Sequence, residues 1–560
     1  MSTIAAWLEG IGRTQSLSCE ACPCWPPDLF ALAGTLIRRS GVYMRLFKDR
    51  DPAAWVSSID TVAKQWRQQL DSTTVAADLP RQLPPEISQL WDKLIALKDR
   101  PINDIDLHPD LAEALIRLTL IADEASRGIG IATNNKPPKP GLPPPASNFL
   151  ALADEMLVEN EQRSFCWDIP RSILCVLGKQ HTPAKGATFR SLSHHLALYQ
   201  PSEIEARWLT AIPTDVERHA QPRGLNLLLL PWPLRVESQD FEEVPPIRNR
   251  ADGTEPPGYF RYRPHTDKPD EFKNKLTRAL DTALAHTRQI DAVVLPELAL
   301  TPQEYLIAED IAYERGSILI CGVRNEPSSE QHAWETNECI LQAAGAVRRV
   351  NPTADSKRQE LLNGLGLKQA KHHRWYVDRP QIVSYQLAGT LSSSRGVWEN
   401  IDLPGRLLHF VTLNPITWSV LICEDLARQE PAADLIRAVG PNLLIALLMD
   451  GPQMSSRWPA RYAAVLAEDP GTSVLTLTSL GMAERSRPIL GSGQRAPASR
   501  IIALWRDAIE GEIQIALDPD HDACLLSLEY QWKTEYCADG RSDDGQTCYP
   551  VYAGYRSFKS

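Results

Sequence analysis

The sequence contains no hydrophobic run long enough to cross a membrane. A spanning helix needs about 20 consecutive apolar residues, whereas long apolar runs here, such as Leu443 to Met449, are far shorter. The N-terminus, Met1 to Trp7, also lacks the basic stretch and apolar core of a secretory signal peptide. We therefore expect a soluble, cytoplasmic protein without a membrane partner.

Positive charge is scarce relative to negative charge. The 560 residues include 59 Lys and Arg against 70 Asp and Glu, which gives a net charge of −11. Non-specific nucleic-acid binding normally needs a positive surface, so we do not expect nucleic acid as the main partner. Hydrophobic residues make up 43% of the chain, enough for a globular core.

Cysteine is sparse and irregularly spaced. The 11 cysteines are an odd number, which fits reduced thiols better than a disulfide framework. The cluster Cys19-Glu20-Ala21-Cys22-Pro23-Cys24 has metal-like local spacing, but no second pair follows at the spacing of a zinc site. Zinc is therefore the minor alternative, and we predict neither a metal nor a cofactor.

Proline content and helical periodicity divide the chain into five predicted segments. Trp55 and Ile59 begin a stripe at helical spacing, whereas the prolines between residues 137 and 145 exclude a helix and predict a stiff linker. We interpret His194 and His195 as packing or surface residues. The segments are a helical N-terminal region (1–133), a proline-rich linker (134–147), a helical connector (148–222), an α/β domain (223–529) and a C-terminal tail (530–560).

From about residue 224, apolar runs alternate with amphipathic segments. This alternation predicts layered α/β structure with helices outside β-sheets. We predict a long loop over 240–270, helices over 273–287 and 302–315, and strands over 225–230, 291–295, 317–323, 338–343, 347–350, 382–387, 407–413, 417–423, 442–448 and 473–478.

The stretch that carries most functional information ends at Cys423. A run of β-formers, residues 417–422, leads into this cysteine, and Pro431 could start a helix beyond it. A thiol at such a strand-to-helix turn can act as a nucleophile. Taken alone, however, a free cysteine is more often a small buried hydrophobe.

Three motifs in order resemble the nitrilase (carbon-nitrogen hydrolase) superfamily. They are Leu295-Pro296-Glu297 at a strand end, a lysine-rich segment from Lys368 to Trp375, and Leu421-Ile422-Cys423-Glu424-Asp425. The resemblance covers about residues 224–520. It implies a nitrilase-like α-β-β-α sandwich, here preceded by a mainly helical region, and assembly as a homodimer or higher homo-oligomer.

The resemblance also implies a catalytic triad of Glu297, Lys371 and Cys423. A thiol with an ordinary pKa near 8.5 needs a carboxylate to accept its proton, and an ammonium can stabilise the charge that develops on the substrate. Glu297 and Lys371 would fill these roles. The backbone amide of Glu424 would be a second donor to the oxyanion.

The lysine assignment leaves two candidates. Lys371 fits the family pattern Lys-x-His better than Lys368 does. Asp378 stands where the family often carries a further glutamate, so it is the candidate for a supporting acid. The interval from Lys371 to Cys423 is long for the family, which indicates an insertion around residues 392–400.

Two classes of function remain open. In the first, the chain is an amidase-type or nitrilase-type hydrolase that cleaves a non-peptide carbon-nitrogen bond of a small molecule through a thioester or thioimidate at Cys423, with water or an amine as acceptor. In the second, it is a regulatory or scaffold protein whose helical N-terminal region binds a partner. A reactive, low-pKa Cys423 is expected only in the first class.

Overall fold

The structure is a computed structural model of the chain. It describes residues 2–15, 18–45, 51–75, 79, 82–130, 147–184, 186–201, 203–210, 224–244, 258–264, 269–325, 334–342, 367–392, 396–413 and 415–560. The predicted linker up to residue 146 and the strand predicted over 347–350 lie outside these ranges.

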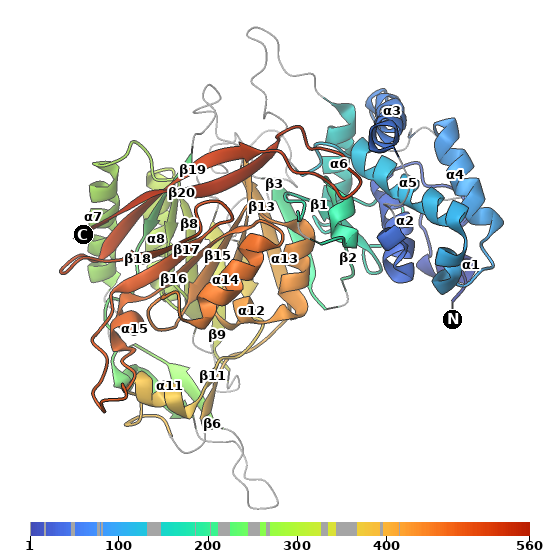
Figure 1. The fold of residues 1–560 in the computed structure, drawn as a ribbon. Helices are drawn as coiled ribbons and strands as arrows, with labels where there is room; N and C mark the ends of the chain where they lie inside the picture. Colours follow the sequence, from blue (N-terminus) through green and yellow to red (C-terminus); the bar gives the residue numbers. More distant parts are fainter. Residues whose placement is uncertain are drawn as a thin grey trace, which may run out of the picture.

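Two seven-stranded sheets form the centre of the molecule (Figure 1). The first has the order β10 (Leu367–Ala370), β9 (Thr336–Gln342), β8 (Ile318–Asn325), β7 (Ala292–Val294), β4 (Gly224–Leu229), β19 (Ala523–Lys533) and β20 (Thr547–Phe558). The second has the order β18 (Glu512–Ala516), β17 (Ile501–Arg506), β16 (Ser473–Thr478), β15 (Leu443–Leu448), β14 (Ile416–Ile422), β13 (Leu407–Leu413) and β3 (Glu205–Thr210).

Alternate side chains of the first sheet enter two different cores. Leu227 and Leu229 pack in the core shared with the second sheet, whereas Leu228 and Leu230 pack with helices α7 (Pro269–Leu284) and α8 (Pro302–Glu314). Successive strand residues point to opposite faces, so a strand buried on both sides is apolar throughout.

Helices also cover the outer face of the second sheet. Helices α12 (Glu424–Ala427), α14 (Trp458–Glu468) and α15 (Leu480–Arg485) contact β14, β16 and β17 respectively. Helix α13 (Asp434–Val439) lies beside them and begins soon after Pro431 (Figure 1). The predicted α-β-β-α sandwich is confirmed.

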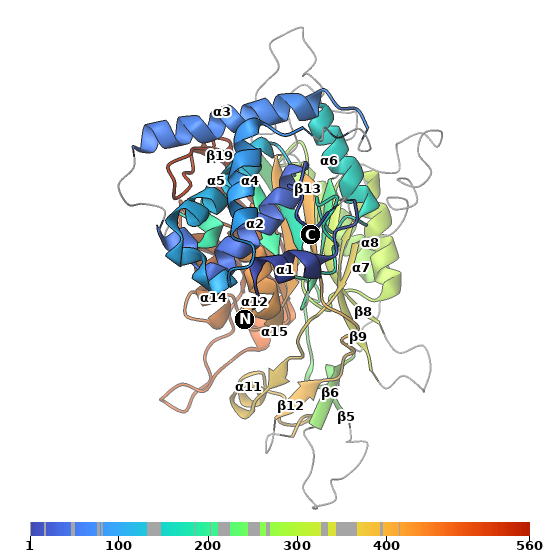
Figure 2. The ribbon, with the colours of Figure 1, turned by 90° about the vertical axis from the view of Figure 1, so that its right-hand side faces the viewer.

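The N-terminal region is helical, as predicted, and packs at one end of the sandwich (Figures 1 and 2). Helix α2 contacts the two-stranded sheet of β1 (Cys175–Gly178) and β2 (Leu196–Tyr199), and β2 in turn contacts α13. The helices are α1 (Ile4–Ile11), α2 (Pro26–Ser40), α3 (Pro52–Asp71), α4 (Pro85–Ala96) and α5 (Pro109–Ala125).

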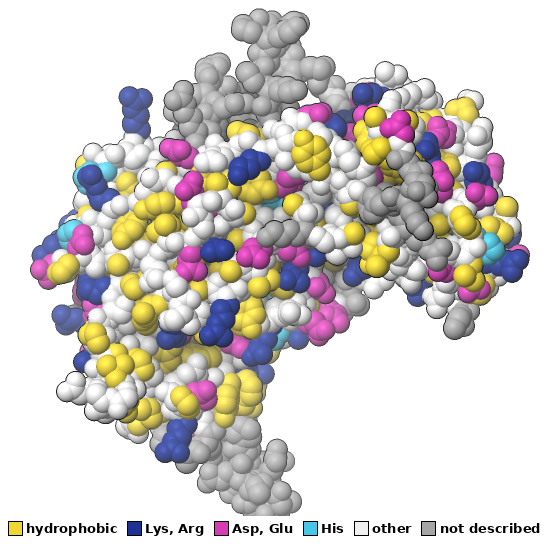
Figure 3. All heavy atoms as spheres, viewed as in Figure 1, with side chains coloured by type: hydrophobic (Ala, Val, Ile, Leu, Met, Phe, Trp, Pro, Cys, Tyr) yellow, Lys and Arg dark blue, Asp and Glu magenta, His cyan; other side chains and the backbone are white. Residues whose placement is uncertain are grey.

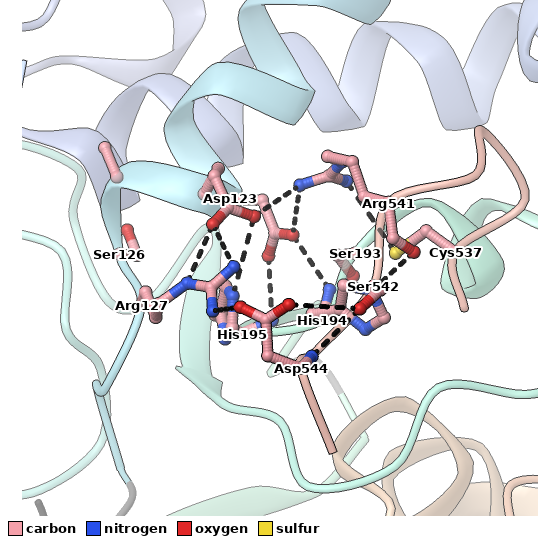
Figure 4. A network of polar contacts seen from close by, with 12 residues as sticks. Asp123, Ser126, Arg127, Ser193, His194, His195, Cys537, Arg541, Ser542 and Asp544 are labelled. Carbon is pink, nitrogen blue, oxygen red and sulfur yellow. Dashed lines mark hydrogen bonds and ion pairs between the residues drawn. The ribbon is translucent and has the colours of Figure 1, made fainter. Parts of the chain in front are cut away.

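A buried arginine joins the N-terminal region to the hairpin loop between β19 and β20 (Figure 4). Arg541 Nη1 lies 3.2 Å from Asp123 Oδ2 and 3.3 Å from Glu124 Oε2, both on α5. The backbone amides of His194 and His195 also donate to Asp123, at 2.8 and 2.9 Å. Both histidines are buried, in line with a packing role. We call the charged group the Arg541 set: Asp123, Glu124, Asp539 and Arg541.

A small four-stranded sheet with one helix projects from the sandwich (Figures 1 and 2). Its own hydrophobic core includes Leu298, Met449 and Met482, which belong to the sandwich. The small sheet is therefore anchored at the ends of β7 and β15. Its elements are β11 (Tyr376–Val377), β12 (Val397–Glu399), β6 (Gly258–Tyr262), β5 (Phe241–Val244) and α11 (Arg379–Ser384).

Several predicted elements need correction. Where the structure describes the supposed helical connector, it contains one α-helix, α6 (Asn148–Glu159), followed by β1, β2 and β3. The supposed loop over 240–270 includes β5 and β6, and the strand predicted over 382–387 overlaps helix α11. The boundary predicted at residue 530 falls inside β19, which pairs with both β4 and β20, so the C-terminal tail belongs to the sandwich.

Within the ranges that the structure describes, no helix is both long enough and apolar enough to span a bilayer. Figure 3 shows basic, acidic and hydrophobic side chains interspersed over one face of the molecule. The described residues on that face form no large surface of a single charge sign.

Candidate active site

Glu297 lies in a tight turn that follows β7. The residue is 3% exposed, and Leu298 after it has a positive φ of 53°. Gly322 on β8 permits the close approach of this turn, because a Cβ at that position would lie 2.5 Å from the Pro296 carbonyl oxygen. Glu297 Oε2 accepts a hydrogen bond of 2.6 Å from the backbone amide of Met449. Its carboxylate is therefore fixed between the two sheets.

Cys423 occupies a sharp turn between β14 and α12. Its φ of 43° and ψ of −104° fall in a region that residues other than glycine rarely adopt. The turn is held on both sides: the Cys423 amide donates to the Leu447 carbonyl at 2.9 Å, and the Cys423 carbonyl accepts from the Leu426 amide at 3.0 Å. Strained positions of this kind cluster at functional sites.

Lys371 directly follows β10, and its ammonium lies between two carboxylates. The Nζ atom donates to Glu297 Oε1 at 2.7 Å and to Glu399 Oε2 at 2.6 Å. An ammonium carries three N–H donors. Among the described residues Nζ makes only these two hydrogen bonds, which leaves one donor for another acceptor.

Two buried residues absent from the predicted site complete this cluster. Asn337 on β9 donates through Nδ2 to Glu297 Oε1 at 2.7 Å and to Glu399 Oε1 at 2.8 Å. Glu399 ends β12 and also accepts from the Trp375 amide at 3.0 Å. A glutamate at the end of a short apolar run was the available sequence signal. We call the cluster the Lys371 set: Glu297, Asn337, Lys371, Glu399 and Cys423.

The structure places Asp378 away from the supporting role predicted for it. Asp378 is exposed and caps α11, accepting a hydrogen bond of 2.8 Å from the Gln381 amide. Glu399 makes the contact with Lys371 that was expected of Asp378. Lys368, the alternative lysine, is exposed on β10, so only Lys371 lies between the carboxylates.

The lysine turn and the cysteine turn are tied together by Asp425. Its carboxylate accepts from the His372 amide at 3.0 Å and contacts His373 Nδ1 at 3.0 Å. Glu424, the residue between the nucleophile candidate and Asp425, forms an ion pair with Arg428 through its side chain. Any role of Glu424 at the reaction centre therefore rests on its backbone amide.

Burial sets the protonation of the Lys371 set. It raises the pKa of the Cys423 thiol, and Glu297 raises it further while Lys371 opposes the shift. Burial also raises the pKa of Glu297 against the effect of Lys371. For Lys371, burial disfavours the charged form, yet Glu297 and Glu399 prevail and raise its pKa. Burial thus acts against the low-pKa thiol that was expected, and a base would have to take the thiol proton when the sulfur attacks.

The described part of the chain holds no group of three or more His, Cys, Asp or Glu residues arranged for a metal ion. Cys19, Cys22 and Cys24 are free and half-buried. Burial raises the pKa of Cys24 to about 11, which disfavours the thiolate that zinc requires. The zinc alternative therefore gains no support.

No protein-family model matches the chain, and no curated protein matches it in sequence. Solved structures similar to it include a Saccharomyces cerevisiae member of branch 10 of the nitrilase superfamily, with 12% identity, 55% of this chain and 91% of that chain covered, and a TM-score of 0.32. A Nesterenkonia amidase of the same superfamily matches with 10% identity, 56% and 94% coverage, and a TM-score of 0.33.

A third similar structure is a glutamine-dependent NAD+ synthetase from Acinetobacter baumannii, with 11% identity, 59% of this chain and 48% of that chain covered, and a TM-score of 0.31. The first two of these proteins thus belong to the superfamily that the sequence motifs resemble. Identity and TM-scores this low leave the reaction and the substrate of this chain open.

Proposed function

We propose that the chain is a carbon-nitrogen hydrolase that cleaves a small amide or nitrile through a covalent intermediate at Cys423. The observation that carries the proposal is the ammonium of Lys371, held between Glu297 and Glu399 with one donor still available. A buried ionic cluster is costly to maintain. This one lies at converging strand ends beside a thiol on a strained turn, where catalysis can use it.

For an amide, the first step forms the bond between Cys423 Sγ and the substrate carbonyl carbon. Glu297 accepts the thiol proton as the bond forms, because the neutral thiol is a poor nucleophile. The carbonyl oxygen becomes an oxyanion that the third N–H of Lys371 and the backbone amide of Glu424 stabilise. Glu297 then returns the proton to the nitrogen, the carbon-nitrogen bond breaks, and ammonia or an amine leaves a thioester.

The second step releases the acyl group. Glu297 accepts a proton from water as the water oxygen attacks the thioester carbon, and the proton passes to the departing Cys423 sulfur. The product is a carboxylic acid. An amine in place of water would give an amide instead. For a nitrile, the sulfur adds to the nitrile carbon, and a thioimidate takes the place of the thioester.

Release of ammonia from short amides and nitriles tests the proposal. The wild type should release ammonia, whereas Cys423→Ala and Lys371→Met should not. Lys368→Met is the matched control, because it removes an exposed lysine only three residues away and should keep wild-type turnover. If neither ammonia nor an acylated Cys423 is detected with any compound, the scaffold function replaces the hydrolase function.

A further inference from the structure

A second polar cluster adjoins the Lys371 set where β15 ends. Asp450 follows Met449, whose amide binds Glu297, and is 3% exposed. Asp450 Oδ1 accepts from the Tyr385 hydroxyl and, at 2.5 Å, from Arg457 Nη2. Ser486 lies against the same turn, because a Cβ on Gly451 would lie 2.5 Å from its Oγ and 3.1 Å from Arg457 Nη1. We call this the Asp450 set: Tyr385, Asp450, Arg457 and Ser486.

The Asp450 set contains buried polar atoms without partners. Among the described residues, Asp450 Oδ2, Arg457 Nε and Ser486 Oγ make no hydrogen bond. A buried polar atom left unpaired is destabilising, so three in one cluster call for an explanation. A ligand group that donates hydrogen bonds would satisfy Asp450 Oδ2 and Ser486 Oγ, which can both accept, whereas Arg457 Nε–H is itself a donor and would need an acceptor.

The backbone around Asp450 is held in place. The Asp450 amide donates to Thr478 Oγ1 at 3.2 Å, and that hydroxyl donates to the Asp450 carbonyl at 2.6 Å. The Gly451 amide donates to the Tyr385 hydroxyl at 3.2 Å. The free Oδ2 atom therefore has a fixed position, as a specificity contact requires.

The Asp450 set is coupled to the reacting groups on two sides. Through Met449 it adjoins Glu297. Through Tyr385 it adjoins Trp375, whose ring centroid lies 5.9 Å from that of Tyr385 and whose amide binds Glu399. The charge of Asp450 also bears on Cys423, since it is among the causes that raise the pKa of that thiol.

The combined charge of the Lys371 set and the Asp450 set favours a cationic ligand over an anionic one. Three carboxylates, those of Glu297, Glu399 and Asp450, face two cations, Lys371 and Arg457. A ligand carboxylate would add a fourth negative group to this low-dielectric region. A ligand ammonium would complete the pairing and donate to Asp450 Oδ2.

We propose that Asp450 Oδ2 binds an ammonium group on the acyl part of the substrate, so that the preferred substrates are ω-amino amides. This inference rests on the proposed function for its substrate class. Asp450 would act as a specificity-determining residue: it would hold the far end of the substrate while the amide carbon lies at Cys423. Plain aliphatic amides would leave the Asp450 carboxylate unpaired.

The test measures binding separately from turnover, by calorimetry on Cys423→Ala. The probes are glycinamide, β-alaninamide and γ-aminobutyramide, each compared with the amide that carries a methyl group in place of the ammonium. At least one ω-amino amide should bind roughly ten- to hundredfold more tightly than its match, the range for a hydrogen bond between charged groups. The double variant Cys423→Ala/Asp450→Asn, in which the asparagine keeps an acceptor for Tyr385 and Arg457, should bind the two members of each pair equally.

Asp507→Asn is the matched control, because Asp507 is also buried and hydrogen-bonded but lies in the loop between β17 and β18. It should leave the preference intact. Equal binding within each pair, no binding of either member, or a preference that survives Asp450→Asn overturns the inference. A binding preference without ammonia release from any amide would instead overturn the proposed function and leave Asp450 as an ammonium-binding residue.

Discussion

The Lys371 set and the Arg541 set both place a buried cation among carboxylates, yet their remaining bonding capacity differs. Arg541 engages all three guanidinium nitrogens: Nε contacts Asp539 at 2.9 Å, Nη1 contacts Asp123 at 3.2 Å and Nη2 donates to the Leu192 carbonyl at 2.6 Å. Lys371 keeps one N–H beyond its two carboxylates, among the residues described. Both sets adjoin a cysteine, since Arg541 Nη2 lies 3.7 Å from Cys537 Sγ, but only Cys423, beside Lys371, has the positive φ of a strained turn.

This difference separates a structural role from a chemical one. A fully satisfied polar network fixes the packing of the elements it joins, and the Arg541 set joins α5 to the β19–β20 loop (Figure 4). A cluster with spare donors and a nucleophile can respond to a substrate. Burial and perturbed pKa values alone would not distinguish the two sets.

The largest expected effect is that of Glu297→Gln on turnover. Glutamine keeps the shape of the side chain but cannot accept the thiol proton, so kcat/KM should fall about 10²- to 10⁴-fold. Steady-state kinetics on an amide substrate measures the loss. Glu304→Gln, a change at a buried glutamate that caps α8, should keep near-wild-type turnover. Similar losses in both variants would contradict the role of Glu297.

Arg541→Met should act on stability and spare the chemistry. Removing one partner of a buried ionic group leaves carboxylates uncompensated, which costs about 3–5 kcal/mol of unfolding free energy. Arg127→Met, at a side chain 32% exposed, should cost about 1 kcal/mol or less. Chemical denaturation gives both values, and turnover per folded molecule should be unchanged. A loss of kcat per folded molecule in Arg541→Met would contradict the purely structural role of the Arg541 set.

Acid should inactivate the protein before it unfolds it. Glu297 must be ionised to accept a proton, and burial raises its pKa, so activity should fall as pH drops through a value above the ordinary 4.3 or so. For Asp123, burial disfavours ionisation, but Arg541 prevails and lowers the pKa. The stabilisation from Asp123 is therefore present above its ordinary pKa of about 3.9 and lost only below it.

Profiles of kcat/KM and of unfolding free energy against pH separate these two effects. The activity limb should lie at the higher pH and should move in Glu399→Gln, which removes a negative charge near Glu297. Activity and stability that fall together would show that acid acts on the fold as a whole.

The smallest effect concerns the two candidates for the supporting acid. Asp378→Ala removes a helix cap and should cost about 1 kcal/mol of stability with turnover unchanged. Glu399→Gln should lower turnover, because Lys371 loses one of its two anionic partners. Thermal unfolding and initial rates compare the pair. Loss of turnover in Asp378→Ala would instead support the sequence-based prediction that Asp378 is the supporting acid.

The strands of the sandwich were predictable because β15 is apolar along its whole length and β14 is apolar apart from Thr417 and Ser419, as is typical of strands buried on both faces. Strand β3 was missed because Glu205, Ala206 and Arg207 favour helices, although pairing with β13 decides the outcome. Helix α11 was missed because Ile382 suggested a strand. Its start was signalled by the capping residue Asp378 and the proline after it.

The site could be predicted only where a motif marks it. Glu297, Lys371 and Cys423 each end or follow a strand at a recognisable motif, whereas Glu399 lies in the stretch interpreted as an insertion. Asp378 was favoured by its closeness to Lys371 along the chain. In the small sheet, β12 pairs with β11, and this pairing places Glu399 beside Lys371. Such long-range pairing has no local sequence signal.

The most direct test of the central claim is labelling of Cys423 with limiting chloroacetamide, an amide-shaped electrophile, followed by intact-mass and peptide analysis. Displacement of chloride by the sulfur requires removal of the thiol proton, which we assign to Glu297. The account predicts that Cys423 reacts before the half-exposed Cys19, Cys22 and Cys24, and that Glu297→Gln removes this advantage while Glu304→Gln keeps it. Labelling of Cys423 that is no faster than that of the other cysteines, or that is unaffected by Glu297→Gln, would contradict it.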